Sequence, residues 1–288
     1  MGEIYGYQTD LVDPGFALFV YPLVTMFAWN FLVGIWVQIW GKRDNSWMDV
    51  NYGICFIIPN TYIFIARRDQ ITARMILVTA IVWFWGARLA HHIWARHTRE
   101  DYRYKKMRED WEAQGTCTYF TKAFGFIYLM QGVFATIVNT SALFVNLYSM
   151  PGPDGSRLDL WYTDGIGFAV WLLGFGLEYI ADRQLKAHLT KPKPGTGKFI
   201  RTGLWRYSRH PNYFGEAVMW WGIYIIACGI DLGWITFISA AFITFLLRFV
   251  SGVPFPEEKY KENPEWKIVC EETNVFCLWF SGMGKDSS

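Results

Sequence analysis

The sequence predicts an all-α fold, a polytopic bundle of about seven transmembrane helices with a polar mouth on the cytosolic side. Hydrophobic residues make up 52% of the 288 positions and charged residues only 18%, whereas soluble domains carry about a quarter charged residues. The apolar residues also fall into blocks of about 20, the length that a helix needs to cross a bilayer. We therefore expect one integral membrane domain over residues 1–288.

Polar or basic segments separate the apolar blocks and define the order of the spans. A polar segment, residues 1–13, precedes the first span. The spans are expected at Pro14–Trp40, Trp47–Ala66, Ile71–Ala95, Tyr119–Leu147, Leu160–Ile180, Phe214–Ile230 and Trp234–Val250. Span two is unusually polar, because it carries Asp49, Asn51 and Asn60. A basic linker, Lys186–Arg201, follows span five, and a soluble tail, residues 251–288, follows span seven.

The placement of Lys and Arg predicts the orientation of the spans. Positive charge clusters after spans one, three, five and seven, and Arg67-Arg68 after span two is the exception. By the positive-inside rule, the amino terminus is then outside or lumenal and the carboxyl terminus cytosolic. Endoplasmic reticulum, another organelle and a bacterial inner membrane all fit this pattern.

The remaining composition argues against nucleic acid and metal. A net charge of +2 is too small to favour nucleic acid. The five cysteines form no C-x-x-C pair, and the five histidines are scattered, so no metal site is expected. The expected partners are membrane lipids.

One polar stretch, Gly203–Glu216 (GLWRYSRHPNYFGE), runs directly into span six. Polar groups at a membrane boundary are costly without partners and indicate a functional site. Pro211 suits the first position of a helix, which would place Asn212 and Glu216 on one face. Arginines suit phosphates, and a carboxylate suits ribose hydroxyls or a nicotinamide amide. The candidate residues of the stretch are Arg206, Arg209, His210, Asn212, Tyr213 and Glu216. Anchoring of the chain at the interface is an equally weighted alternative.

Two further charged groups belong to this hypothesis. Glu178 and Asp182 share a face of span five, where a structural ion pair is the alternative interpretation. Basic residues recur every three or four positions from Arg88 through Arg96 to Arg103. This pattern predicts one basic helical stripe that could supply cations to a phosphate group, and snorkelling of Arg99 and Arg103 at a positive-inside boundary is the alternative interpretation.

The run Gly203–Glu216, with Glu178–Leu185 (EYIADRQL) upstream, resembles the steroid 5α-reductase superfamily and, within it, an uncharacterised membrane branch. The resemblance is strongest over residues 160–260. It implies a membrane oxidoreductase of lipid metabolism that uses NADPH to reduce a carbon–carbon double bond conjugated to a carbonyl. The implied substrate is apolar, steroid-, sterol- or polyprenoid-like, and enters from the lipid. By position, the resemblance assigns cofactor contacts to Asp182, Asn212, Glu216 and Arg248.

The chain departs from the family at the catalytic positions. Steroid-reducing members polarise the substrate carbonyl with a tyrosine on span three and a glutamate on span two. This chain offers Trp85 and Asp49 there, so Asp49 is the candidate acid and Tyr52 the weaker alternative. A protonated carboxyl can donate a hydrogen bond to a developing enolate, whereas a carboxylate at a helix start is also favoured by the dipole.

Two other functions stay open. The Arg209–Tyr213 core (RHPNY) also occurs in membrane methyltransferases that use S-adenosylmethionine. Alternatively, the Trp85 departure suits a non-catalytic accessory subunit of a larger membrane complex.

Overall fold

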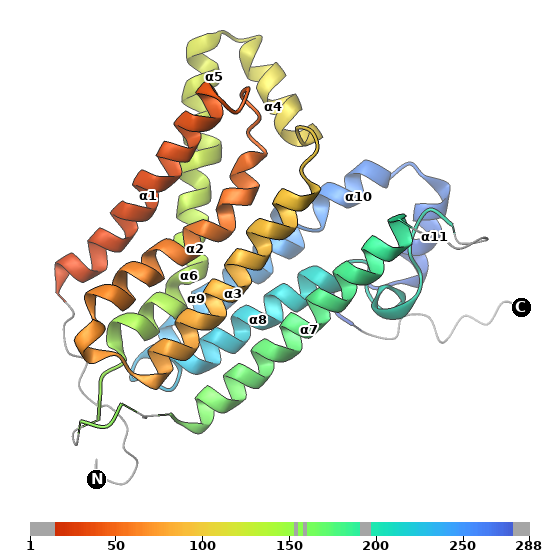
Figure 1. Ribbon diagram of the computed structural model, residues 1–288. Helices are drawn as coiled ribbons and strands as arrows, with labels where there is room; N and C mark the ends of the chain where they lie inside the picture. The colour runs from red at the N-terminus through yellow and green to blue at the C-terminus, as the bar shows by residue number, and fades with distance from the viewer. Residues whose placement is uncertain (1–14, 153–154, 158–159, 191–196, 279–288) are drawn as a thin grey trace, which may run out of the picture. The chain divides into compact units, whose positions relative to one another are not determined.

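The computed structural model describes residues 15–152, 155–157, 160–190 and 197–278 (Figure 1). Within these residues the chain is helical, and a single isolated bridge joins Ser208 to Asn274. The predicted all-α class is confirmed. The chain forms two compact units, Met1–Trp161 with Ala227–Thr236 (unit 1) and Tyr162–Ile226 with Phe237–Ser288 (unit 2). The single domain expected over residues 1–288 stays a prediction.

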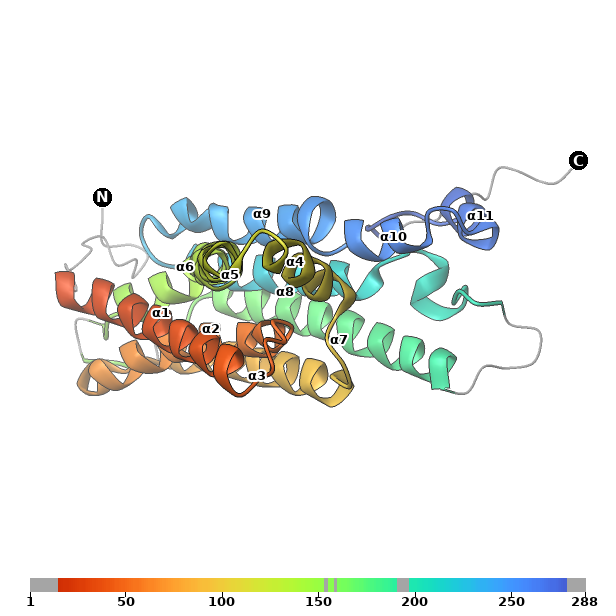
Figure 2. The same ribbon diagram turned by 90° about the horizontal axis from the view of Figure 1, so that it is seen from above.

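Unit 1 is a helical bundle in which α2 holds the central position. Helix α2 packs against α1, α3 and α6, and α1, α2 and α3 run side by side (Figure 2). A short π-helical turn joins α5 to α6 without a break. The helices are α1 (Phe16–Ile39), α2 (Trp47–Ala66), α3 (Ala73–Arg96), α4 (Tyr102–Glu112), α5 (Thr116–Lys122), η2 (Ala123–Leu129) and α6 (Met130–Tyr148).

Buried asparagines explain why span two is polar. Asn51 donates to the side-chain oxygen of Asn30 on α1 at 2.6 Å, and Asn60 donates to that of Asn139 on α6 at 2.9 Å. Each of these amides is buried. Hydrogen bonds between helices satisfy polar groups that would be costly in lipid. The polar residues of α2 therefore face the bundle and help to hold it together.

Arg67, one of the two arginines that break the positive-inside pattern, is a buried cap, whereas the neighbouring Arg68 is exposed. The Arg67 guanidinium donates to the backbone carbonyls of Asn146, Leu147 and Ser149 at 2.7–2.8 Å. These carbonyls lie at the end of α6, where the last turn has no intrahelical donors. Because Arg67 is only 3% exposed, it is not one of the surface charges that the positive-inside rule counts. The orientation of the termini stays a prediction.

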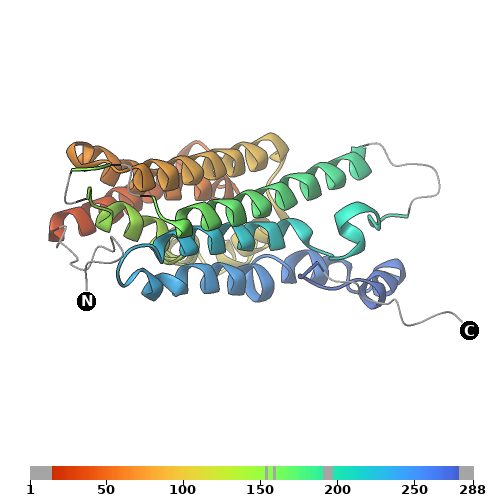
Figure 3. The same cartoon turned by 90° about the horizontal axis from the view of Figure 1, so that it is seen from below.

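Unit 2 is organised around the pair α7 and α8, which run side by side (Figure 3). Glycines bring the two backbones together. A Cβ atom on Gly174 of α7 would lie 2.6 Å from the carbonyl oxygen of Gly215 on α8, and one on Gly222 would lie 2.6 Å from that of Gly167. The elements are α7 (Tyr162–Thr190), η3 (Gly203–Arg206), α8 (Pro211–Ala227), α9 (Phe237–Phe245), η5 (Leu246–Val250), α10 (Pro254–Tyr260) and α11 (Pro264–Glu272).

The expected count of seven spans is not confirmed. Helices form at all seven predicted positions, but α2 is polar and α8 has only 17 residues. Helix α7 continues beyond the predicted end at Ile180, because the following Ala, Arg, Gln, Leu and Lys are good helix formers. Five segments among the described residues are long and apolar enough to cross a membrane: Phe16–Ile39, Ala73–Arg96, Thr116–Tyr148, Tyr162–Thr190 and Gly233–Tyr260.

The two predicted terminal segments have different outcomes. Residues 1–13 lie outside the described residues. The start of the predicted tail is folded, with α10 and α11 followed by the bridge at Asn274. Its last residues, 279–288, lie outside the described part.

We expect Gly215→Ala to destabilise the protein. The new Cβ would meet the backbone nitrogen of Glu178 at 2.6 Å, and such overpacking costs about 1–3 kcal/mol. Gly176→Ala is the matched control, because nothing lies within 4 Å of its Cβ position. Thermal unfolding of the detergent-purified variants measures the difference. Equal melting temperatures would contradict the glycine-mediated packing.

Candidate functional site

The polar stretch folds as expected at the start of α8. Pro211 occupies the first helical position, so Asn212 and Glu216 lie one turn apart on the same face. The Asn212 side-chain nitrogen donates to Asp182 Oδ1 on α7 at 3.3 Å. Since a Cβ on Gly215 would touch the backbone of Glu178, the first turns of α8 lie against the acidic part of α7.

Two of the carboxylates in this region of unit 2 are buried. Glu178 is 5% exposed and Glu216 is 8% exposed, and Asp182 is half-buried. We call Glu178, Asp182, Asn212 and Glu216 the α7–α8 cluster. Carboxylates are rarely buried unless they are paired or bind a ligand. The burial of these carboxylates makes the cluster a candidate ligand site in unit 2.

The side-chain oxygen of Asn212 is the unusual atom of this cluster. It is buried, and no hydrogen-bond donor reaches it from the described residues. Leaving a buried acceptor without a donor costs about 1–3 kcal/mol. The amide nitrogen is held by Asp182, which orients the oxygen as an acceptor for a ligand N–H group.

Arg209 is engaged inside the protein. It is 8% exposed and donates to the carbonyls of Cys270 and Thr273 at 3.0 and 2.8 Å. Its Nε donates to Glu257 Oε1 at 2.9 Å. Its Nη2 also donates to Glu257 Oε2 at 3.4 Å, so four of its five donors are directed at α10 and the end of α11. This geometry joins the polar stretch to the folded part of the tail, and the predicted cofactor contact of Arg209 stays a prediction.

His210 lies in the same internal network. Its Nε2 is 3.1 Å from Glu257 Oε1, and its ring stacks on Tyr213 at 5.5 Å. Burial lowers the pKa of His210, the charges of Arg209 and Arg248 lower it further, and Glu257 opposes them. The imidazole is therefore neutral near pH 7, which suits an internal hydrogen bond more than phosphate binding.

Two arginines of unit 2 keep their guanidinium groups available. Arg206 is exposed and Arg248 is half-buried. Within the described residues, neither side chain makes a hydrogen bond or ion pair. Arg248 lies close enough to His210 for its charge to lower the pKa of that histidine. Among the described arginines of unit 2, these two are therefore candidates for binding an anionic ligand.

The predicted basic stripe is interrupted. Helix α3 ends at Arg96, so the continuation of the stripe to Arg103 is wrong. His97 adopts an extended backbone, and Arg103 lies on α4, where it pairs with Asp101 and Asp49 at 2.8 and 3.2 Å. Arg88 is half-buried, and exposed Arg96 contacts His92. Their predicted cofactor contacts stay predictions.

Asp49 lies in a polar cluster of unit 1. Its Oδ1 accepts hydrogen bonds from the Tyr104 hydroxyl at 2.5 Å and from Gln131 at 3.4 Å, and Arg103 donates to its Oδ2 at 3.2 Å. Burial raises the pKa of Tyr104, and the Asp49 charge raises it further. The phenol therefore stays protonated.

The sequence reasoning missed Tyr104 and Glu257. Tyr104 adjoins the charged run after span three, but only the folding of α4 brings it to Asp49. One feature of the sequence could have indicated an acidic partner such as Glu257, because an arginine and a histidine require such a partner if they are buried. Tyr52 packs edge-on against Phe56, as does Trp85, which is 2% exposed. Trp85 is thus part of the core of unit 1.

We expect Glu257→Gln to lower the free energy of unfolding by about 3 kcal/mol, because it leaves the buried Arg209 without its anion. Glu258→Gln is the matched control, since Glu258 is 75% exposed and lies 3.7 Å from Lys261. Loss of such a surface pair costs at most about 1 kcal/mol. Denaturant titration of both variants tests this role. Equal effects would mean that Glu257 does not hold the tail.

Known proteins share parts of this sequence. The chain is 36% identical over 113 residues to 3-oxo-5-alpha-steroid 4-dehydrogenase 1 of Homo sapiens, covering 38% of each chain. It is 32% identical over 114 residues to the Bos taurus protein of that name, covering 38% of this chain and 43% of the relative. The matches thus span less than half the length of these relatives.

A longer match extends over most of the chain. An uncharacterised protein of Schizosaccharomyces pombe is 25% identical over 259 residues, covering 77% of this chain and 71% of the relative. No solved structure matches the chain significantly. Residues 35–273 match the family described as "Protein of unknown function (DUF1295)". The resemblance to steroid 5α-reductases is confirmed, and the chain belongs to the DUF1295 family.

Proposed function

We propose that the protein is a membrane-embedded, NADPH-dependent reductase of a carbon–carbon double bond conjugated to a carbonyl in an apolar, steroid-like substrate. The partial match to 3-oxo-5-alpha-steroid 4-dehydrogenase 1 supports this reaction class. The observation that carries the proposal is the buried acceptor of Asn212, held in place by Asp182.

The residues of unit 2 fit a nicotinamide nucleotide. The Asn212 oxygen suits the carboxamide N–H of a nicotinamide, and the carboxylates of Asp182 and Glu216 suit ribose hydroxyls. Arg206 and Arg248 supply cations for the phosphates, including the 2′-phosphate that distinguishes NADPH from NADH. When bound, the nucleotide supplies a hydride to the substrate.

The second half of the reaction requires an acid. Addition of a hydride to the β-carbon leaves an enolate, which takes a proton at its α-carbon. The candidate in unit 1 is the pair Asp49 and Tyr104, which shares one phenol proton in its hydrogen bond. In this step the proton leaves that hydrogen bond for the α-carbon, and Arg103 stabilises the negative charge that remains on the pair. Asp49 itself stays the predicted acid, and Tyr104 is the further candidate that the structure places beside it.

Asn212→Leu and Arg206→Ala are expected to weaken NADPH binding by about 10- to 100-fold each, the effect of losing one ligand hydrogen bond. Arg183→Ala is the matched control, because Arg183 adjoins Asp182 on α7 but is exposed and contacts Tyr179. Titration of the purified protein in nanodiscs with NADPH, followed by nucleotide fluorescence, measures the affinities. An equal loss in Arg183→Ala would refute the assignment of this site.

The same preparation separates the alternative functions. Binding of labelled S-adenosylmethionine without NADPH binding would favour a methyltransferase. Binding of neither compound would favour an accessory subunit.

Tyr104→Phe and Asp49→Asn are expected to lower turnover of an enone about 100-fold or more, the range for loss of an acid catalyst, with the NADPH affinity unchanged. NADPH oxidation with a panel of apolar enones measures turnover. Tyr52→Phe is the comparison variant. Loss of turnover in Tyr52→Phe but not in Tyr104→Phe would make Tyr52 the donor.

A further inference from the structure

A cavity of about 400 Å³ opens where α1 turns into α2 in unit 1. Three tryptophans line it, Trp36, Trp40 and Trp47, together with the acidic residues Asp44 and Glu100. Lys42 also lines the cavity. None of these residues belongs to the α7–α8 cluster or to the cluster around Asp49.

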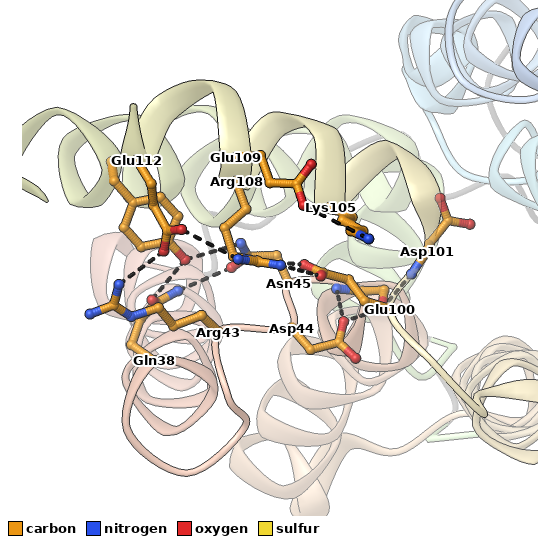
Figure 4. A network of polar contacts seen from close by, with 12 residues as sticks. Gln38, Arg43, Asp44, Asn45, Glu100, Asp101, Lys105, Arg108, Glu109 and Glu112 are labelled. Atoms are coloured by element: carbon orange, nitrogen blue, oxygen red, sulfur yellow. Dashed lines mark hydrogen bonds and ion pairs between the residues drawn. The ribbon is translucent and has the colours of Figure 1, made fainter. Parts of the chain in front are cut away.

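Two of the lining residues, Asp44 and Glu100, belong to a polar network (Figure 4). Arg108 of α4 pairs with Glu100 at 2.9 Å and with Glu112 at 3.3 Å. Glu112 in turn pairs with Arg43 at 2.9 Å. These ion pairs tie the α1–α2 turn and Glu100 to α4, beside the cavity.

The turn itself adopts a strained backbone. Lys42 and Arg43 have φ values of 55° and 59°, a left-handed conformation that costs about 1 kcal/mol or more for a residue other than glycine. The conformation places Arg43 against Glu112 and turns the chain so that Asp44 lines the cavity. Asp44 is further held by the backbone nitrogen of Ser46 and by His97, each at 3.0 Å.

The lining suits a quaternary ammonium group next to a phosphate. Trp36 and Trp47 meet edge to face at 5.7 Å, so their rings present differently oriented walls. Aromatic rings bind trimethylammonium groups by cation–π interaction. The carboxylates of Asp44 and Glu100, which are paired with His97 and Arg108, add negative charge nearby. Lys42 is exposed and makes no ion pair with another described residue, so its ammonium is available to a phosphate.

The length of α1 leads us to expect the cavity at the depth of lipid headgroups. Helix α1 has 24 residues and is therefore about 36 Å long, enough to cross the hydrocarbon core. Trp36 and Trp40 belong to its last turn and its cap, where tryptophans meet the membrane–water interface. Their side chains are 42% and 68% exposed. At this depth, membrane lipids are the ligands with the highest local concentration.

We propose that this pocket binds the phosphocholine headgroup of a membrane phospholipid. The ammonium group lies among Trp36, Trp40 and Trp47 near Asp44, and the phosphate is bound by Lys42. The site is separate from the proposed nucleotide site, and its test does not depend on enzymatic activity.

The test counts the lipids that the purified protein retains from mixed nanodiscs of phosphatidylcholine, phosphatidylethanolamine and phosphatidylglycerol, by native mass spectrometry. Wild type is expected to retain phosphatidylcholine at least about tenfold over the other two, the discrimination that roughly 1.4 kcal/mol provides. Trp40→Ala and Asp44→Asn are expected to abolish this preference. Trp234→Ala is the matched control, because Trp234 is similarly exposed at 63% and does not line the cavity.

Each result decides the proposal. Equal retention of the three lipids by wild type overturns it, as does loss of the preference in Trp234→Ala, which would indicate general interfacial anchoring. Far-ultraviolet circular dichroism and melting temperature identify variants that fail to fold. If Trp40→Ala fails to fold, Lys42→Ala at the exposed turn takes its place and must weaken the preference. Displacement of phosphatidylcholine by soluble phosphocholine shows recognition of the headgroup alone, and its absence shows that the acyl chains contribute.

Discussion

The candidate site depends on the close approach of α7 and α8 at their glycines. Gly167 and Gly174 meet Gly222 and Gly215 at distances that a Cβ atom would prevent. In lipid the hydrophobic effect does not draw helices together, so small residues and close packing take its place. The approach joins the acidic face of α7 to the polar start of α8. The glycines, which have no side chain, thereby allow the contact in which Asp182 accepts a hydrogen bond from Asn212.

Two buried arginines show how the protein uses charge for structure. Arg67 binds the carbonyls at the end of α6, and Arg209 binds those at the end of α11. Helix ends carry partial negative charge, which stabilises a cation and satisfies its donors. Each arginine therefore joins two segments that lie far apart in the sequence. A buried cation near a membrane boundary suggests a functional site. When its donors are bound by other groups of the protein, a structural role accounts for it.

Helix α4 gives unit 1 its polar chemistry. It supplies Tyr104 and Arg103 to Asp49, and Arg108 to the network beside the tryptophan-lined cavity. Neither site is formed by the long apolar helices alone, because their lipid-facing surfaces carry few hydrogen-bond donors. The short amphipathic helix outside the spans thus completes the polar ends of the bundle.

The sequence by itself determined the helical membrane class, the start of α8 at Pro211 and the shared face of Asn212 and Glu216. These features depend on composition and on periodicity over a few residues, which local structure obeys. The resemblance to steroid 5α-reductases was also visible in one continuous run. Only the tertiary structure decided the partners of the charged side chains. Arg209 meets Glu257 across 48 residues and Asp49 meets Tyr104 across 55, and no local pattern encodes pairs that helix packing brings together.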